Sequence, residues 1–216
     1  MEGIVQNKRR LFIIGASGFG REVEQWLKLI PEEDRDWYVC GFLDVNLTTL
    51  RDFPSDLVIV GNENTFTFER NDLVVLAIAE PKVKKRIFLA LKDRVEFYTY
   101  IAPNTIVGDN CNIGEGSIIC PSCILTTNIH LGKCITINTA TNIGHDVIVD
   151  DFTSLMANVD VAGCVKIEEG VFVGSKAMII PSRKIYKNSI VGAGSVVIRN
   201  VKENTTVFGN PAVAIC

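Results

Sequence analysis

The second half of the chain repeats a hydrophobic pattern every six residues. From Ile101 to Val197, every sixth residue is Ile, Val or Leu. The position four residues later is mostly small or β-branched, and Gly often follows the aliphatic residue. Because six is an even number, the alternation of strand faces survives from one hexad to the next. A fixed short period of this kind predicts a solenoid of short β-strands around a long, narrow core.

Polar corners separate the predicted strands. Gly144, His145 and Asp146 are typical of the residues between inward pairs, and we expect Gly to supply the unusual backbone dihedrals of such turns. The alternative is an ordinary sandwich with a chance pattern, and the unbroken run of aliphatic positions argues against it. The repeat therefore allows an unusual corner residue to be placed in space by counting.

The first hundred residues alternate strand-like and helix-like patterns instead. Apolar runs at 11–14, 39–43, 57–60 and 73–79 predict strands. An amphipathic stretch that stops at Pro31 and a second one from Pro81 to Leu91 predict helices. This order predicts a small, Rossmann-like parallel α/β sheet. We place the domain boundary near residue 99, with the α/β domain over 1–98 and the all-β solenoid over 99–216.

Composition limits the class of protein. The 216 residues are 47% hydrophobic and 22% charged with a formal net charge of −3, which is typical of a soluble globular protein. The sequence has no block of Lys and Arg residues that would indicate nucleic-acid binding, and it has no apolar run that approaches membrane-spanning length. The first ten residues lack the apolar core of a signal peptide, so a cytoplasmic location is expected. Cys120 and Cys123 have a metal-like spacing, but the hexad is expected to turn them to opposite faces, and we predict no metal site.

A glycine-rich loop joins the first predicted strand to the first helix. It reads Gly15-Ala16-Ser17-Gly18-Phe19-Gly20. Glycines let the backbone approach an anion, and the free N–H groups at a helix start favour negative charge. Asp44 ends the next strand, where its carboxylate could accept hydrogen bonds from a ribose or base. The spacing differs from the dinucleotide fingerprint, so NAD binding is not expected. On these residues alone, a simple tight turn explains the loop equally well.

The chain has two histidines, and one of them, His145, lies at a corner beside Asp146. A neutral imidazole can take a proton from an amine or hydroxyl as it attacks a thioester, and an adjacent carboxylate can orient the ring. Without further context, an inert surface histidine is the commoner explanation. His130 is the last residue of its hexad and is interpreted as a surface residue.

The aliphatic-Gly-x-x-small-x repeat resembles the hexapeptide-repeat acyltransferases, which fold as left-handed parallel β-helices with three hexads to a triangular turn and assemble as trimers. With the glycine loop in front, the chain resembles the bacterial acetyltransferases of nucleotide-linked amino sugars and the sialic acid O-acetyltransferase-like proteins grouped with them. The resemblance implies that the loop and Asp44 hold the acceptor, and that His145 and Asp146 are the catalytic pair. Phe19 replaces a His of some members and Ala79 replaces a frequent Gly, so the identity of the acceptor stays open.

The same resemblance implies the rest of the site. Acetyl-CoA would lie in a groove between neighbouring subunits against Ser154, Gly163, Ser175 and Ala193, and Asn138 would lie on the acceptor side. With three hexads to a turn, Gly163 follows His145 in the stack and leaves room for a thin pantetheine arm. From the residues alone, Asn138 could equally cap a turn.

The sequence therefore predicts a homotrimeric, acetyl-CoA-dependent acetyltransferase of a nucleotide-linked amino sugar, with His145 as general base. Acetylation of a sugar hydroxyl would keep the chemistry and change the acceptor. A non-catalytic trimer that binds a sugar or nucleotide is a third interpretation, and the intact His145–Asp146 pair counts against it. A carbonic-anhydrase-like coil is not expected, because it needs several metal-binding histidines and this chain has two.

Overall fold

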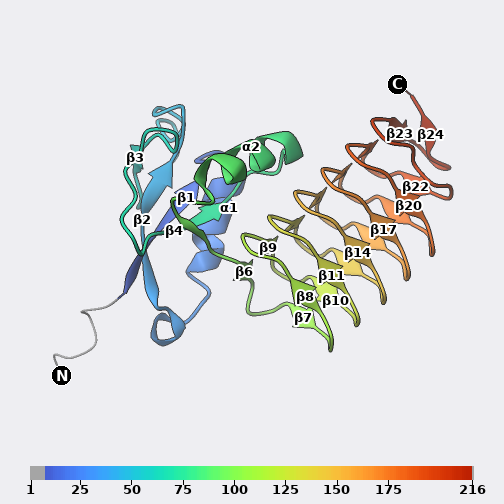
Figure 1. Ribbon diagram of the computed structural model, residues 1–216, viewed down its shortest axis with the longest axis horizontal. Coiled ribbons are helices and arrows are strands. Elements are labelled where there is room, and N and C mark those ends of the chain that lie inside the picture. The colour runs from blue at the N-terminus through green and yellow to red at the C-terminus, as the bar shows by residue number, and fades with distance from the viewer. Residues whose placement is uncertain (1–7, 216) are drawn as a thin grey trace.

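The computed structural model describes residues 8–215, which form two parts (Figure 1). The first is a five-stranded sheet with two α-helices, and the second is a column of short strands that extends away from it. The small parallel-sheet domain and the parallel β-solenoid that the sequence predicts are both confirmed. No helix within residues 8–215 is long and apolar enough to cross a membrane.

The sheet of the first part has the strand order β3-β2-β1-β4-β5, and every neighbouring pair is parallel. Its elements are β1 (Arg9–Ile14), α1 (Gly18–Leu27), a short 3-10 helix (Glu32–Asp34), β2 (Trp37–Leu43), β3 (Ile59–Gly61), β4 (Leu73–Leu76), α2 (Pro81–Leu91) and β5 (Glu96–Phe97). All four residues of β4 are buried, as in a central parallel strand covered on both faces. Because the strands are parallel, the glycine loop after β1 lies at their carboxyl edge.

The predicted bounds of these elements need small corrections. β1 and β2 each begin two residues before the apolar run, β4 ends at Leu76, and α1 ends at Leu27, ahead of Pro31. The sequence pattern does not predict β5, because two residues are too few to show a period. The chain passes from the sheet to the solenoid between Phe97, the last residue of β5, and Tyr100, the first residue of β6.

The solenoid consists of strands of two or three residues, most of them paired in parallel with the strand three hexads later. The first sheet contains β6, β9, β12, β15, β18, β21, β23 and β24, the second β7, β10, β13, β16, β19 and β22, and the third β8, β11, β14, β17 and β20. The last turn is shorter, since Ile190 pairs with Thr206.

The bounds of the solenoid strands are β6 (Tyr100–Ile101), β7 (Ile106–Val107), β8 (Asn112–Ile113), β9 (Ile118–Ile119), β10 (Ile124–Leu125), β11 (His130–Leu131), β12 (Thr136–Ile137), β13 (Asn142–Ile143), β14 (Ile148–Val149), β15 (Ser154–Leu155), β16 (Asp160–Val161), β17 (Lys166–Ile167), β18 (Phe172–Val173), β19 (Met178–Ile179), β20 (Lys184–Ile185), β21 (Ile190–Val191), β22 (Val196–Val197), β23 (Thr206–Phe208) and β24 (Val213–Ala214).

The expected role of the corner glycines is wrong in one respect. The left-handed residue of a corner recurs every six positions and is usually not Gly: Asn128 has φ 53°, Cys134 51° and Asp146 61°. Gly144 is required for another reason, because a Cβ there would lie 2.7 Å from the backbone nitrogen of Gly163. The glycine after the aliphatic residue therefore lets successive turns stack closely at the corner.

The α/β domain packs on the outer face of the first sheet. The outward residues Tyr100, Ile118, Thr136 and Ser154 of that sheet are at most 1% exposed, whereas Ile190, farther along, is 43% exposed. The Tyr100 hydroxyl donates to the carbonyl of Trp26 in α1 at 2.9 Å. This contact fixes which side of the solenoid faces the glycine-loop domain.

Candidate active site

His145 lies at the corner between β13 and β14, in a column of corners that we call the His145 corner (residues 108–110, 126–128, 144–146 and 162–164). Its side chain is 61% exposed, and Nδ1 is 2.7 Å from Oδ2 of Asp146. The ring packs over Gly163, where a Cβ would lie only 2.5 Å from Nε2. The sequence count thus places Gly163 correctly in space. The absence of a side chain at Gly163 leaves Nε2 free to meet a ligand.

Asp146 is held from a second side by asparagines of the same column. Its Oδ1 accepts from Nδ2 of Asn128 at 3.1 Å, and Oδ1 of Asn128 accepts from Nδ2 of Asn110 at 3.1 Å. The hydrogen bond to His145, and next the bond from Asn128, lower the pKa of the Asp146 carboxyl. The carboxylate therefore stays ionised and fixed in orientation beside the imidazole.

Sequence reasoning missed Asn128 and Asn110, although they precede Asp146 by one and two whole turns of the coil. It also missed Cys164, which is one turn beyond Asp146 and donates its backbone N–H to the carbonyl of His145 at 2.9 Å. Cys164 is exposed, and its sulfur lies near the donor atoms of the His145–Asp146 pair. The three-hexad register was the signal that could have found all three.

The residues expected to contact acetyl-CoA do not gather around His145 within one chain. Gly163 lies beside His145, but Ser175 and Ala193 lie on the corner between the first and second sheets. We call that column the Ser175 corner (residues 138–140, 156–158, 174–176 and 192–194). Ser175 is half-buried and Ala193 is exposed, and they occupy successive turns, since the N–H of Gly194 donates to the carbonyl of Ser175 at 2.8 Å.

Ser154 and Asn138 have local partners that the sequence did not reveal. The buried Ser154 hydroxyl donates to the carbonyl of Ala79 in the α/β domain at 2.6 Å. Asn138 opens the Ser175 corner, and its side-chain oxygen accepts from the N–H of Thr139 at 2.6 Å. The roles of Ser154 toward acetyl-CoA and of Asn138 toward the acceptor stay predictions.

Two of the loop glycines are required by the fold. Gly15 has φ +96°, and a Cβ there would lie 2.9 Å from the carbonyl oxygen of Ala77. A Cβ on Gly20 would lie 1.8 Å from the carbonyl oxygen of Gly15. A Cβ on Gly18, by contrast, would meet no atom within 4 Å. A tight turn therefore explains Gly15 and Gly20, but it does not explain Gly18.

The start of α1 has hydrogen-bonding groups to spare. Ser17 occupies the N-cap position, and its side chain makes no capping hydrogen bond. The Asp44 carboxylate instead organises the loop, because its two oxygens accept from the N–H groups of Ala16 and Asn46, both at 2.8 Å. The helix start, with no acidic residue in its first turn, keeps the partial positive charge that attracts an anion.

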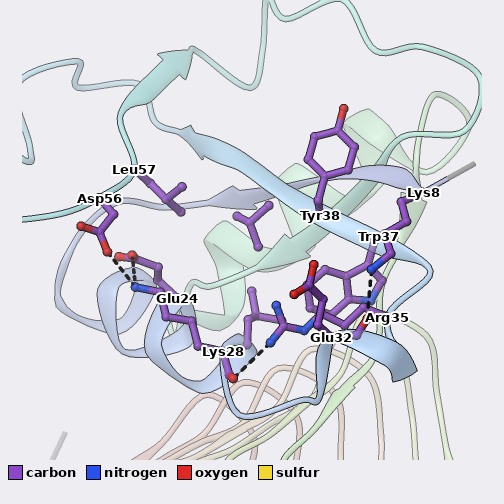
Figure 2. Close-up of a pocket in the computed structure, with 11 residues that line it drawn as sticks. Lys8, Glu24, Lys28, Glu32, Arg35, Trp37, Tyr38, Asp56 and Leu57 are labelled. Atoms are coloured by element: carbon purple, nitrogen blue, oxygen red, sulfur yellow. Dashed lines mark hydrogen bonds and ion pairs between the residues drawn. The ribbon is translucent and has the colours of Figure 1, made fainter. Parts of the chain in front are cut away.

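A cavity of about 200 Å³ lies at the opposite end of α1, against the start of β2 (Figure 2). Most of its charged side chains already have partners. Lys28 is 3.1 Å from Glu24 and 3.2 Å from Asp56, and Arg35 donates to the backbone carbonyl of Lys28 at 3.1 Å. None of the residues predicted for the site lines this cavity, and we assign it no ligand.

Known proteins are similar to this chain in both the N-terminal sheet domain and the solenoid. Residues 10–91 match the PglD N-terminal domain family. The chain is 34% identical over 147 residues to GDP-perosamine N-acetyltransferase of Escherichia coli O157:H7. The aligned region covers 63% of this chain and 65% of that protein. The chain spans less than two thirds of the length of the first curated relatives it matches.

Solved structures share the whole architecture. WeeI from Acinetobacter baumannii AYE is 27% identical with a TM-score of 0.82, over 96% of this chain and 100% of that one. PerB from Caulobacter crescentus, solved in complex with CoA and GDP-perosamine, is 23% identical with a TM-score of 0.84, over 95% of this chain and 97% of that one. These likenesses confirm the resemblance that the sequence indicates.

Proposed function

We propose that this protein is an acetyl-CoA-dependent acetyltransferase that acts on the amino group of a nucleotide-linked sugar. Its N-terminal domain is similar to that of PglD, and its β-solenoid is similar to that of PerB. One observation carries the proposal. An exposed imidazole has Nδ1 fixed by a carboxylate at 2.7 Å, while Nε2 lies over a glycine. This is the arrangement that a general base at an open surface requires.

His145 supplies the base. With its Nδ1–H donated to Asp146, the neutral ring presents the lone pair of Nε2 to solvent. Nε2 takes a proton from the acceptor nitrogen as that nitrogen forms a bond to the acetyl carbon and the C–S bond breaks. The leaving thiolate then receives a proton. Asp146, kept anionic by its lowered pKa, stabilises the imidazolium between these two proton transfers.

The α/β domain supplies the acceptor site in this proposal. The helix start at Ser17 and Gly18 has free hydrogen-bonding groups and open space, which suit the phosphates of a nucleotide sugar. Asp44 anchors the loop and has lone pairs left for a hydroxyl or base N–H. The E. coli relative is named for a nucleotide amino sugar, and PerB was solved with one bound, which supports the same acceptor class here.

A homotrimer completes the site. Within one chain, the Ser175 corner is a different corner of the coil from the His145 corner. The α/β domain packs on the first sheet and not at the His145 corner. If the His145 corner of one subunit faces the Ser175 corner of the next, the base and Gly163 line one groove together with Asn138, Ser175 and Ala193. A cytoplasmic location stays a prediction from the sequence.

The test is an acetyl-CoA consumption assay with UDP-, GDP- and CMP-linked amino sugars, with products identified by mass spectrometry. We expect transfer to one nucleotide class and an amide product that survives mild alkali, whereas a product lost in alkali would show acetylation of a hydroxyl.

His145→Ala should lower turnover about 10²–10⁴-fold with the thermal unfolding curve unchanged, because the side chain is exposed. Near-normal turnover of the folded variant would exclude His145 as the base.

A further inference from the structure

Donor atoms of three side chains converge at the His145 corner. One ligand atom each of His145, Asp146 and Cys164 lies within 4.8 Å of the other two. All three residues are exposed, so their side chains can adjust toward a common point. The reaction proposed above uses His145 and Asp146 but assigns no role to the thiol.

The register of the solenoid explains why the thiol is there. Asp146 and Cys164 are one turn apart and have nearly the same left-handed backbone, with φ 61° and 59°. In the turns below, the corresponding side chains Asn110, Asn128 and Asp146 contact one another in series at 3.1 Å. Cys164 takes the next position of this stack. Among residues 8–215 it is also the one cysteine that is exposed.

We propose that His145, Asp146 and Cys164 form a site for a thiophilic divalent cation, with Zn²⁺ as the cation whose preferences they match, and that its binding switches off the catalytic corner. The cation site stands on the donor geometry alone, while its inhibitory effect rests on the proposed function.

The donor set fits this cation. Imidazole nitrogen, carboxylate oxygen and thiolate sulfur are the protein ligands of Zn²⁺, and three of them plus a water complete a tetrahedral shell. Bond lengths of about 2.0–2.3 Å place tetrahedral donors about 3.3–3.6 Å apart, so the exposed side chains need to close by about 1.5 Å at most. Cys164 releases its thiol proton to solvent as the metal–sulfur bond forms.

Inhibition follows from either way of ligating the imidazole. Ligation through Nε2 occupies the lone pair that accepts the proton from the acceptor. Ligation through Nδ1 replaces the 2.7 Å hydrogen bond to Asp146, and the ring loses the contact that orients it. In both cases the cation removes the base without disturbing the fold.

The direct test is a titration with cobalt(II) chloride in the absence of acetyl-CoA and acceptor. Cobalt bound to a thiolate gives a charge-transfer band in the near ultraviolet, which reports ligation by sulfur. We expect this band at one cobalt per chain in the unaltered protein. Cys164→Ser should abolish it, and His145→Asn should weaken binding at least about tenfold, the loss typical even of outer-sphere partners. Cys40→Ser, which alters a half-buried thiol in β2, is the matched control and should keep the band.

The absence of the band, or a band of equal strength in the Cys164→Ser protein, would overturn the cation site. A second arm measures acetyl transfer at rising zinc chloride. Cys164→Ser should keep the basal turnover and need at least about tenfold more zinc for half-inhibition, and equal inhibition of both proteins would overturn the regulatory role. A protein that binds cobalt through Cys164 but transfers no acetyl group would instead contradict the proposed function and leave the site standing.

Discussion

At the residue scale, the orientation of His145, the proposed base, depends on a side chain one turn away from it. Asn128 donates to Oδ1 of Asp146, and the other carboxylate oxygen contacts His145. A carboxylate held at both oxygens cannot rotate away from the ring. Asn128 is therefore a positioning residue, which acts on the reaction only through Asp146.

Replacing Asn128 by Leu should lower kcat by about 2- to 12-fold, the value of one hydrogen bond of about 0.5–1.5 kcal/mol. The KM values for both substrates should change little, because Asn128 lies behind the base. Asn204→Leu is the control, since Asn204 is also exposed and left-handed but belongs to neither the His145 corner nor the Ser175 corner. An equal loss of kcat in both variants would show that the effect comes from the strained backbone rather than from the contact with Asp146.

How far the sequence predicts the site depends on how each contact arises. The neighbour relation of His145 with Gly163 follows from counting three hexads along the chain, and the pairing with Asp146 follows from adjacency. Asn128 is one of many corner asparagines, and only its hydrogen bond to Asp146 distinguishes it. The hydroxyl of Ser154 cannot be assigned from the repeat at all, because its partner Ala79 belongs to the other domain.

At the scale of elements, the loop between β1 and α1 can be tested without disturbing the fold. Gly18→Val adds a side chain where an added Cβ meets no atom within 4 Å, so the protein should fold normally. If phosphates bind at this helix start, the side chain occupies their space, and KM for the acceptor should rise at least about tenfold, or about 1.4 kcal/mol. The affinity for acetyl-CoA, measured by calorimetry, should stay unchanged.

Two results would contradict this assignment. Loss of acetyl-CoA binding in a folded Gly18→Val protein would reverse the roles of the two domains. No change in either affinity would mean that the loop is only a turn. Gly20→Val serves as the contrasting variant, because its Cβ would lie 1.8 Å from the carbonyl oxygen of Gly15, and it should lower stability rather than affinity.

A buried lysine joins helix α2 to the solenoid. Nζ of Lys84 donates to the carbonyls of Cys134 at 2.9 Å and Thr153 at 3.0 Å, and to the hydroxyl of Thr136 at 3.1 Å. Burial lowers the pKa of Lys84 from 10.5 to about 7. The interface between the domains therefore contains an amine that changes charge near neutral pH.

The folded-state pKa of Lys84 is below its unfolded value, so between about pH 7 and 10.5 the unfolded chain holds a proton that the folded chain has released. The free energy of unfolding should rise with pH across this window. Lys84→Met should lack that rise and should be destabilised by about 1–3 kcal/mol, because the Cys134 carbonyl loses its donor. Denaturant unfolding at several pH values between 6 and 10 measures both effects.

Lys85→Met is the matched control for Lys84→Met. Lys85 is the next residue of α2, but its side chain is 41% exposed and its ammonium pairs with Glu169. This variant should keep the pH dependence of the unaltered protein. Parallel pH curves for the unaltered protein and Lys84→Met would show instead that the three acceptors hold the buried amine in its charged form throughout.

The elements differ in how visible they are in the sequence. The solenoid is predicted with its register because each hexad repeats the same burial pattern, and β4 because it is continuously apolar. The two-residue strand β5 has no period to detect. Lys84 breaks the usual expectation that a helical lysine faces water, and its burial depends on acceptors that lie about 50 to 70 positions away.

At the scale of the whole molecule, one chain separates the parts that the proposed reaction needs. The base lies on the His145 corner, whereas Ser175, Ala193 and Asn138 lie on the Ser175 corner, and the α/β domain packs on the first sheet. A triangular coil cannot bring two of its own corners together. The sequence repeat predicts each corner, but it cannot show which corners of different subunits face each other.

This separation predicts complementation between inactive variants. In the proposed cyclic trimer, each site takes its base from one subunit and its acceptor domain from the next. A mixture of His145→Ala and Gly18→Val chains, unfolded together and refolded as mixed trimers, should contain sites in which both contributions are intact. With equal amounts and random assembly, about one site in four satisfies this condition, so activity at low acceptor concentration should recover to about a quarter of the unaltered level.

The same two variants refolded separately and then mixed are the control, and they should stay inactive as long as subunits do not exchange. Sedimentation should show trimers in every sample. Recovery in the co-refolded sample alone would establish that the base and the acceptor domain of one site come from different chains. Absence of recovery in verified mixed trimers would place both in the same subunit, and it would require the glycine-loop domain to reach the His145 corner of its own chain by leaving the first sheet, which the Lys84 contacts oppose.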